Sequence, residues 1–142
     1  MRISAKIDYA CRAIFELSLH WPNQNPLQVH EIAERQGIPT NFLIQILFNL
    51  KQLGYVRSTR GKEGGYILAK APAQIKFSDL VKHFGPEPEI KQKKAVQGDN
   101  NCVINTIWEE VDTAVENILV SINFEDICNR ARANEKTIMY EI

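Results

Sequence analysis

Residues 28–69 constrain the fold more than any other part of this chain, because two amphipathic segments are followed there by two β-patterned runs. In the first segment, residues 30–36, apolar side chains share one helical face, and Gly37 supplies a left-handed turn after it. The β-patterned runs, residues 55–59 and 66–69, are joined by the Gly-rich, charged tip RGKEGG. A helix, a turn, a second helix and a hairpin in this order predict a winged helix-turn-helix.

The second amphipathic segment opens with Pro39, Thr40 and Asn41, which favour a helix start, and it ends at Gly54. We expect a broad buried face made of Phe42, Leu43, Ile46, Leu47 and Leu50. In a winged helix this segment is the recognition helix, which lies in the major groove of double-stranded DNA. The side chains placed to meet the major groove are Thr40, Asn41, Phe42 and Gln45.

The hairpin tip is cationic and rich in glycine. Arg57, Arg60 and Lys62 are expected to contact the DNA backbone or the minor groove, and Gly61, Gly64 and Gly65 to shape the wing. Taken alone, the hairpin also fits an ordinary solvated loop with chance charges. The helix-turn-helix directly before it favours the DNA-binding interpretation.

The formal net charge of zero hides an uneven distribution along the chain. Residues 30–70 carry six Lys or Arg residues against three acidic residues, whereas residues 103–142 carry three against eight. The regional charges are therefore +3 and −5. A basic reading surface with an acidic far side is compatible with selective DNA binding.

The remaining chain predicts helices over residues 3–20 and 77–84, a polar loop over 86–102 and a long helix over 103–122. The long helix carries a heptad-like apolar stripe made of Ile104, Trp108, Val111, Val115, Ile118 and Ile122. A narrow stripe of this kind predicts a homodimer interface; packing against the chain's own core is the alternative. Residues 124–130 are expected to add a helical turn or two, and the terminal TIMYEI has strand-like character.

The segment QGIPTNFLIQILFNLKQLGYVRSTRGKEGGYILAK resembles the DNA-binding core of the Rrf family of bacterial transcription regulators, the IscR, NsrR and CymR type. The opening MRISAKIDYACRAIFELS is similar to that family's first helix. The resemblance spans nearly the whole chain and implies a dimer that binds a palindromic operator. The expected fold is mainly α with a small β-hairpin, divided into a winged helix-turn-helix (1–85), a polar loop (86–102) and a dimerisation helix with a C-terminal tail (103–142).

The resemblance also raises the question of an iron–sulfur cluster, because cluster-binding members have three closely spaced cysteines before the long helix. This chain keeps only Cys102 of the three, and Ile90 and Val96 fall where the others would be. Asp8 stands where some members have an acidic ligand. A cluster usually needs four thiolate or nitrogen ligands, so we expect no cofactor and no metal site. The alternative is a cluster-bearing regulator in which each site of a dimer draws Asp8 from one chain and Cys102 from the other. A single-thiol redox switch at Cys102 is a further alternative.

Composition is that of a globular protein, with 44% hydrophobic and 24% charged residues. The chain has no long apolar run and no secretory layout at its N-terminus, so we expect a cytoplasmic protein with no membrane partner. Three widely spaced cysteines do not suggest a disulfide framework, and GKEGG lacks the form of a phosphate-binding loop. We therefore expect a DNA-binding repressor rather than an enzyme. A winged helix used only for protein interaction is the alternative, and an effector small molecule, a partner protein or redox state is a candidate signal.

Overall fold

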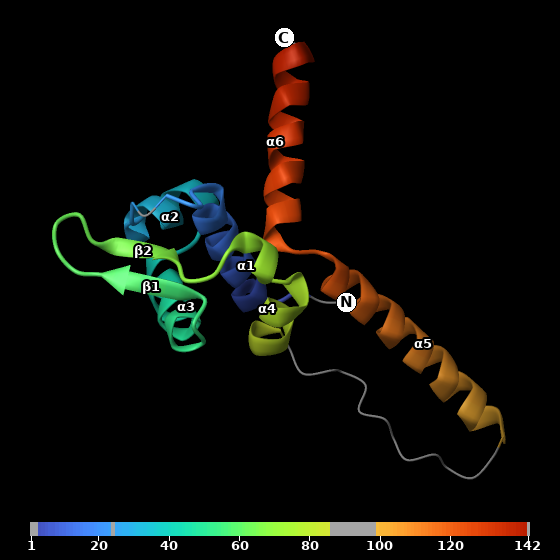
Figure 1. The fold of residues 1–142 in the computed structure, drawn as a ribbon. Helices are drawn as coiled ribbons and strands as arrows, with labels where there is room; N and C mark the ends of the chain where they lie inside the picture. The colour runs from blue at the N-terminus through green and yellow to red at the C-terminus, as the bar shows by residue number, and fades with distance from the viewer. Residues whose placement is uncertain (1–2, 24, 86–98, 142) are drawn as a thin grey trace.

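The protein is mainly helical, with a single two-stranded antiparallel sheet among the residues described. The computed structural model describes residues 3–23, 25–85 and 99–141. Its elements are α1 (Ala5–Leu19), α2 (Val29–Gln36), α3 (Thr40–Gln52), β1 (Val56–Thr59), β2 (Gly65–Leu68), the 3₁₀ helix η1 (Pro72–Gln74), α4 (Phe77–Phe84), α5 (Asp99–Ser121) and α6 (Phe124–Glu141). The expected mainly α fold with a small hairpin is confirmed. In Figure 1, α1–α4 and the hairpin form one body, and α5 and α6 extend from it in different directions.

The ends of the short helices follow from local hydrogen bonding and from glycine. At the start of α2, the backbone N–H of Gln28 donates to Oε2 of Glu31 at 3.2 Å, and α4 begins with the same arrangement between Lys76 and Asp79 at 3.1 Å. Gly37 ends α2 with φ 64°, in the left-handed region. The helix and turn boundaries around α2 and α3 therefore lie where the sequence predicts them.

The hairpin is anchored to the segment that precedes α2. Its strands pair in the register Arg57 with Ile67 and Ser58 with Tyr66. Leu27 extends the pairing, because its N–H donates to the carbonyl of Tyr66 at 3.0 Å and its own carbonyl accepts from Tyr66 N–H at 2.8 Å. The wing is thus fixed at its base to the body of the molecule.

The hydrophobic core lies between α1, α2, α3, α4 and the hairpin. Ala10, Ala13 and Ile14 of α1 are fully buried at its centre. Phe124, the first residue of α6, also reaches this core, where its ring stacks on Phe77 with centroids 6.0 Å apart. The junction between α5 and α6 is therefore attached to the winged body.

The long helix begins earlier than the sequence suggests. Residues 99–102, which we assigned to the polar loop, belong to α5, and the rest of that loop lies outside the described residues. Short polar residues such as Asp and Asn suit a helix start as well as a loop, so composition did not separate the two. Ile122 follows α5 rather than lying in it, and its carbonyl accepts from the N–H of Phe77 at 2.8 Å.

The expectation of strand-like character near the C-terminus is wrong, because α6 continues as an 18-residue helix to Glu141. A reciprocal cap starts it: Asp126 N–H donates to Oδ1 of Asn123 at 2.9 Å, and Asn123 N–H to Oδ2 of Asp126 at 3.3 Å. Once nucleated, a run of Ala, Arg, Glu and Lys propagates well, and one Thr-Ile pair does not stop it. None of the helices described is long and apolar enough to span a lipid bilayer.

Candidate nucleic-acid interface

Helix α3 has one face in the core and one face in solvent. Leu43, Ile46, Leu47 and Leu50 are buried to 3% exposure or less, and they fix the rotation of the helix. Thr40, Asn41 and Gln45 are consequently exposed on the opposite side. Gln45 Nε2 donates to Oδ1 of Asn49 at 3.3 Å, so an amide pair already lies along this surface.

Phe42 differs from the expectation that it is buried, since its side chain is 58% exposed. It lies in the first turn of α3, to one side of the buried stripe, where its ring forms an aromatic pair with Tyr9 of α1. The two ring centroids are 6.3 Å apart. Phe42 therefore belongs to the exposed surface of α3, where its assignment to the DNA interface requires it to be.

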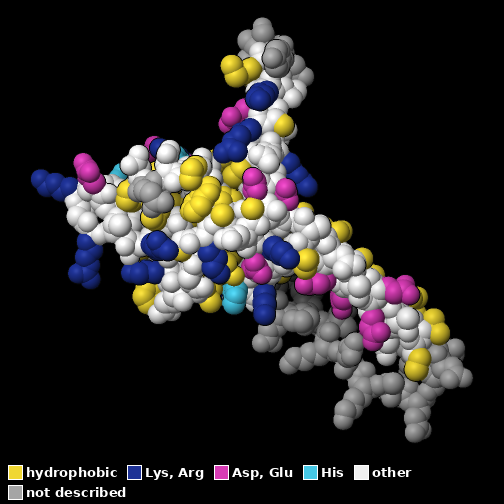
Figure 2. All heavy atoms as spheres, viewed as in Figure 1, with side chains coloured by type: hydrophobic (Ala, Val, Ile, Leu, Met, Phe, Trp, Pro, Cys, Tyr) yellow, Lys and Arg dark blue, Asp and Glu magenta, His cyan; other side chains and the backbone are white. Residues whose placement is uncertain are grey.

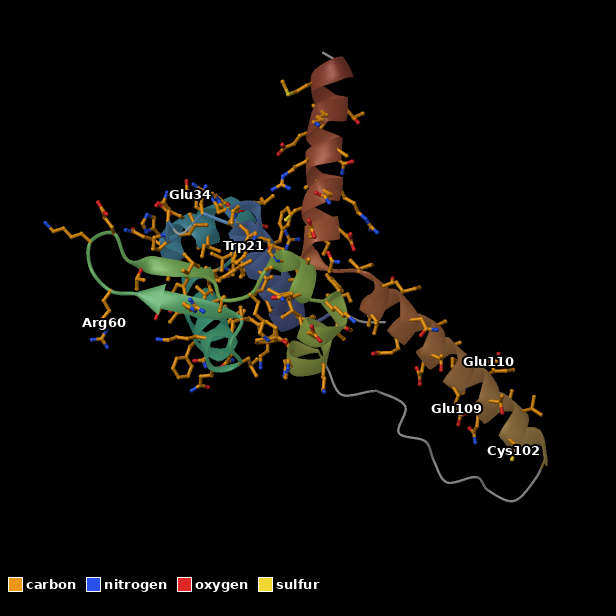
Figure 3. All side chains as sticks on the ribbon, viewed as in Figure 1. Trp21, Glu34, Arg60, Cys102, Glu109 and Glu110 are labelled. Carbon is orange, nitrogen blue, oxygen red and sulfur yellow. The ribbon has the colours of Figure 1, made fainter. Side chains whose placement is uncertain are left out.

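The wing carries its cations in solvent. Arg57, Arg60 and Lys62 are all exposed, and Arg60 points away from the hairpin (Figure 3). The carbonyl of Lys62 accepts from Nε2 of Gln28 at 3.1 Å, which ties the tip to the start of α2. The tip is thus positioned by contacts at its base and near its end, while its charged groups stay available.

The glycines of the wing are needed for the backbone conformation of the hairpin and for its packing against the rest of the protein. Gly61 has φ 111°, a conformation that other residues rarely adopt. A Cβ at Gly64 would collide with the carbonyl of Thr59, and one at Gly65 with the carbonyl of Leu27. Gly64 and Gly65 are therefore required by close approach of the protein backbone, a reason that the sequence alone did not reveal.

A cationic hollow of about 570 Å³ lies between the end of α3 and the base of the hairpin. Its lining consists of Lys51, Gly54, Val56, Arg57, Ser58, Ala69 and Lys70. Lys70 Nζ lies 4.8 Å from the centroid of the Tyr55 ring, which holds this ammonium group over an aromatic face. Sequence reasoning counted Lys51 and Lys70 as regional charge but did not place them in the site, because their convergence with Arg57 depends on the turn at Gly54.

Two apolar residues of the exposed α3 surface were also missed. Ile44 is 53% and Phe48 is 50% exposed, although both belong to a strongly apolar segment. Their helical spacing places both residues outside the buried stripe, so this spacing could have predicted from the sequence that they are exposed.

Charge is distributed unevenly over the surface. In Figure 2, Lys and Arg side chains lie around the hairpin and beneath it, whereas Asp and Glu gather along α5. The basic side coincides with the exposed part of α3 and the wing. An anionic polymer would therefore meet attraction on this side and repulsion along α5.

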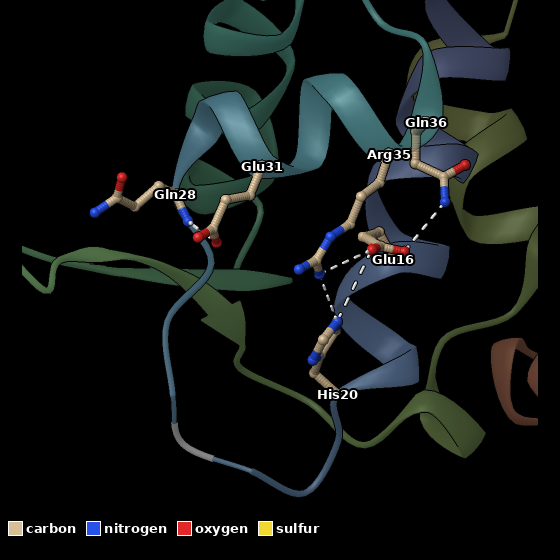
Figure 4. A network of polar contacts seen from close by, with 6 residues as sticks. All are labelled: Glu16, His20, Gln28, Glu31, Arg35 and Gln36. Atoms are coloured by element: carbon tan, nitrogen blue, oxygen red, sulfur yellow. Dashed lines mark hydrogen bonds and ion pairs between the residues drawn. The ribbon is translucent and has the colours of Figure 1, made fainter.

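A buried carboxylate joins α2 to α1 behind the interface. Glu16 is 5% exposed, and its Oε1 accepts from Nη1 of Arg35 at 3.2 Å while its Oε2 accepts from Nε2 of Gln36 at 3.2 Å. His20 Nε2 lies 3.1 Å from the same Arg35 nitrogen (Figure 4). This network fixes the first helix of the helix-turn-helix against the core, and α3 is positioned in turn.

The apolar stripe of α5 faces solvent. Ile104, Trp108, Val111 and Ile118 are between 46% and 60% exposed, whereas Val115 and Ile122 are half-buried. Val103 and Ile107, which the heptad assignment left out, widen the stripe with 59% and 47% exposure. Along most of its length α5 therefore has an apolar face that the described part of this chain does not cover.

Within one chain, the described residues do not bring together the ligands of an iron–sulfur cluster. Cys102 is exposed near the start of α5, at the end away from α1 (Figure 3), whereas the carboxylate of Asp8 on α1 accepts from Nε of Arg12 at 2.9 Å. Burial raises the pKa of Cys11 to about 12, with Asp8 adding to the shift, and burial also raises the pKa of Cys128. Across the described residues, no group of three or more His, Cys, Asp or Glu side chains is arranged to hold a metal.

The comparisons with known proteins agree with this geometry. A family model described as "Rrf2: Iron-dependent Transcriptional regulator" matches residues 3–130. The HTH-type transcriptional regulator IscR of Yersinia pseudotuberculosis serotype O:1b (strain IP 31758) is 30% identical over 91% of this chain and 80% of its own length. The structure of T. potens IscR is 34% identical, with a TM-score of 0.75 over 92% of this chain and 88% of that chain.

The fold is also that of CymR of B. subtilis, named the global cysteine regulator, with 25% identity and a TM-score of 0.80 over 92% of this chain and 98% of that one. These relatives are transcriptional regulators, so the expectation of a DNA-binding regulator rather than an enzyme is confirmed. The match over residues 3–130 and the winged helix together show that this chain belongs to the Rrf2 family of transcriptional regulators.

Proposed function

We propose that the protein is a homodimeric repressor that binds a palindromic operator through α3 and the wing formed by β1 and β2. The observation that carries this proposal is that α3 has exposed amides near its start and a cationic hollow at its end. Asn41 and Gln45 are exposed on α3, and the lining of the hollow includes Arg57 at the base of the charged wing. Polar base readers flanked by cations are what a duplex requires.

Helix α3 would supply the contacts to base edges. Thr40, Asn41 and Gln45 lie in its first two turns, the part of a recognition helix that reaches the bases in helix-turn-helix proteins. Amide side chains can pair with an adenine through two hydrogen bonds in the major groove. Gln45 would exchange its hydrogen bond to Asn49 for one to a base, whereas exposed Phe42 would contribute apolar contact at the edge of the surface.

The hollow and the wing would supply phosphate contacts. Lys51, Arg57 and Lys70 converge at the hollow, and the wing cations Arg60 and Lys62 extend beyond it. Phosphate contacts set the register of a protein on DNA and make its affinity fall with salt concentration. The turn at Gly61 and the packed Gly64 and Gly65 would hold the wing in the shape that presents these cations.

Helix α5 would join two copies of the chain. Its stripe (Ile104, Trp108, Val111, half-buried Val115 and Ile118) is covered most simply by the same stripe of a second copy, and Ile122 would flank it. A two-fold axis along this contact would present two α3 helices to half-sites about one DNA turn apart. Repression is the simplest output of such a molecule, because occupying a promoter requires only binding.

The signal in this proposal does not depend on an iron–sulfur cluster. The exposed Cys102 is a single thiol, and burial raises the pKa of both Cys11 and Cys128. Anaerobic purification of the full chain, followed by an absorption spectrum and an iron assay, tests this part. We expect no charge-transfer absorption and no stoichiometric iron; a stoichiometric cluster would contradict it.

Selection of duplexes from a random DNA library by the full chain tests the function itself. We expect enrichment of a palindrome, with Arg60→Ala weakening binding and lowering the slope of log affinity against log salt by about one. Lys136→Ala, an exposed cation on α6, is the matched control and should leave both unchanged. No enriched palindrome would favour a winged helix used for protein interaction.

A further inference from the structure

Two large apolar side chains lie on the surface of α3 that also carries its amide readers. Ile44 and Phe48 are four residues apart and therefore stack on one face, one helical turn from each other. Both are about half exposed, whereas the four core-facing apolar residues of α3 are 3% exposed or less. The core of the winged body therefore does not account for Ile44 and Phe48.

Helical spacing places this pair among the polar residues already assigned to the groove. Asn41 lies three residues before Ile44, Gln45 lies three before Phe48, and both spacings bring side chains onto one surface. From Asn41 to Phe48 the helix rises about 10 Å, the length of roughly three base-pair steps. The exposed surface of α3 thus alternates amide and hydrocarbon groups over a length that a major groove can follow.

The surroundings of the pair favour DNA over a protein partner. By helical rotation, Asn41 and Gln45 separate the pair from exposed Phe42. Lys51 and Arg57 of the cationic hollow lie beyond the pair towards the hairpin. In the major groove, an A·T pair presents adenine hydrogen-bonding groups beside the 5-methyl group of thymine. Amide and hydrocarbon side chains in alternation match that edge, whereas a G·C pair offers no methyl group there.

We propose that Ile44 and Phe48 are specificity-determining residues that contact thymine 5-methyl groups in the operator half-site. The inference rests on the proposed function, in which α3 lies in the major groove. It adds that A·T pairs occupy the positions facing the second and third turns of α3. Phe42 is not part of this pair, because it lies to the other side of Asn41 and Gln45, beside Tyr9.

Replacing single thymines by deoxyuridine in a selected operator tests the inference, because this change removes the methyl group and keeps the base pair. We expect the wild-type dissociation constant to rise about fourfold for each contacted methyl group, the amount expected for one buried methyl. In the Ile44→Ala variant, deoxyuridine at the position facing residue 44 should cause little further loss of operator affinity. In the Phe48→Ala variant, the same should hold for deoxyuridine at the position facing residue 48. Such coupling identifies which side chain contacts which methyl group.

Matched controls separate this result from general effects. Ile138→Ala removes an apolar side chain of similar exposure on α6 and should keep the full deoxyuridine effect. Because Ile44 and Phe48 are exposed, both Ala variants should keep the wild-type melting temperature.

Four outcomes would overturn the inference. A selected half-site without thymines contradicts it, and so does a deoxyuridine effect that is the same in the wild type and in both Ala variants. In either case specific binding survives, so the proposed function stands. Failure to select any duplex overturns the function and the inference together. A change in self-association of the Ala variants without a change in deoxyuridine sensitivity would assign this face to protein contact instead.

Discussion

Helices α3 and α5 have similar patterns in sequence and different surroundings in the structure. Both carry apolar residues at helical spacing, but the main stripe of α3 is at most 3% exposed and most of the α5 stripe is about half exposed. The two helices differ in exposure because they have different neighbours within the chain. Helix α3 is enclosed by α1, α2 and β1, whereas α5 meets the body at its C-terminal end, next to Phe77 (Figure 1). Periodicity therefore predicts that a face will be buried but not which molecule will cover it.

The largest expected effect concerns the apolar stripe of α5, which the described part of the chain does not cover. Ile118→Asp places a charge in the α5 stripe, and a two-fold interface contains this charge twice. We expect the dimer dissociation constant to rise about 1,000-fold, equivalent to about 4 kcal/mol, as measured by sedimentation equilibrium.

Thr113→Asp is the matched control, because helical rotation places residue 113 opposite the stripe, and it should leave association unchanged. Helical circular dichroism should be retained in both variants. If Ile118→Asp associates as the wild type does, the α5 stripe is not the dimer interface, and the contrast between α3 and α5 has another cause.

The next effect concerns the face that is covered within the chain. Leu47→Ala removes a fully buried side chain of α3 and should lower the free energy of unfolding by about 3 kcal/mol, because it leaves a cavity in the core. Urea titration at one fixed protein concentration measures this change. Ile44→Ala, on the exposed side of the same helix, should stay within about 0.5 kcal/mol. Equal losses in the two variants would contradict the assignment of the two faces.

A smaller effect distinguishes buried from exposed ion pairs within the winged body. Arg35→Ala removes one donor from the buried Glu16 carboxylate but leaves Gln36 in place, so we expect a loss of about 1–2 kcal/mol in unfolding free energy. Arg12→Ala breaks the exposed pair with Asp8 and should cost at most about 0.5 kcal/mol. Urea titration of both variants checks the order; a larger loss for Arg12→Ala would show that Glu16 is not the structural anchor of α2.

The winged helix could be predicted from sequence because each of its boundaries has a local cause. Gly37 and Gly54 end helices through positive φ, and the strand runs flank a glycine-rich tip. Spacing alone predicted Leu43, Ile46, Leu47 and Leu50 of the core stripe of α3 correctly, but it wrongly added Phe42. What spacing did not provide was the convergence of Lys51, Arg57 and Lys70, since that depends on how the hairpin turns back beside α3.

The C-terminal part was less predictable for a physical reason. Among its described residues only Phe124 and Cys128 are buried, and partly buried Ile127 packs against the core, so the hydrophobic pattern that marks buried elements is weak there. Helix α6 owes its start to the cap between Asn123 and Asp126, and a Thr-Ile pair near its end was mistaken for a strand. The role of Gly65 escaped for a related reason, because its close neighbour Leu27 is distant in sequence.

The smallest effect concerns the different reactivity of the buried and the exposed cysteines. Burial, with a contribution from Asp8, raises the pKa of Cys11 from 9.0 to about 12, and burial raises that of Cys128 against the opposing effect of Arg132. At pH 8 iodoacetamide should therefore modify Cys102 in the native protein, and should reach the other two only after unfolding. Peptide mass mapping measures this, and modification should leave the melting temperature unchanged.

The same pKa shift has a defined sign in stability. The native state holds the Cys11 proton more tightly than the unfolded state does. The contribution of Cys11 to the free energy of unfolding is therefore complete below pH 9 and is lost as the pH rises from 9 towards 12. Cys11→Ser, which lacks this titration, should reduce the decline over that range. Dimerisation should not alter the alkylation pattern, because Cys102 lies two residues before Ile104 and so about 200° around α5 from the stripe. Protection of Cys102 at dimeric concentrations, relieved by Ile118→Asp, would instead place the interface on the opposite face of α5.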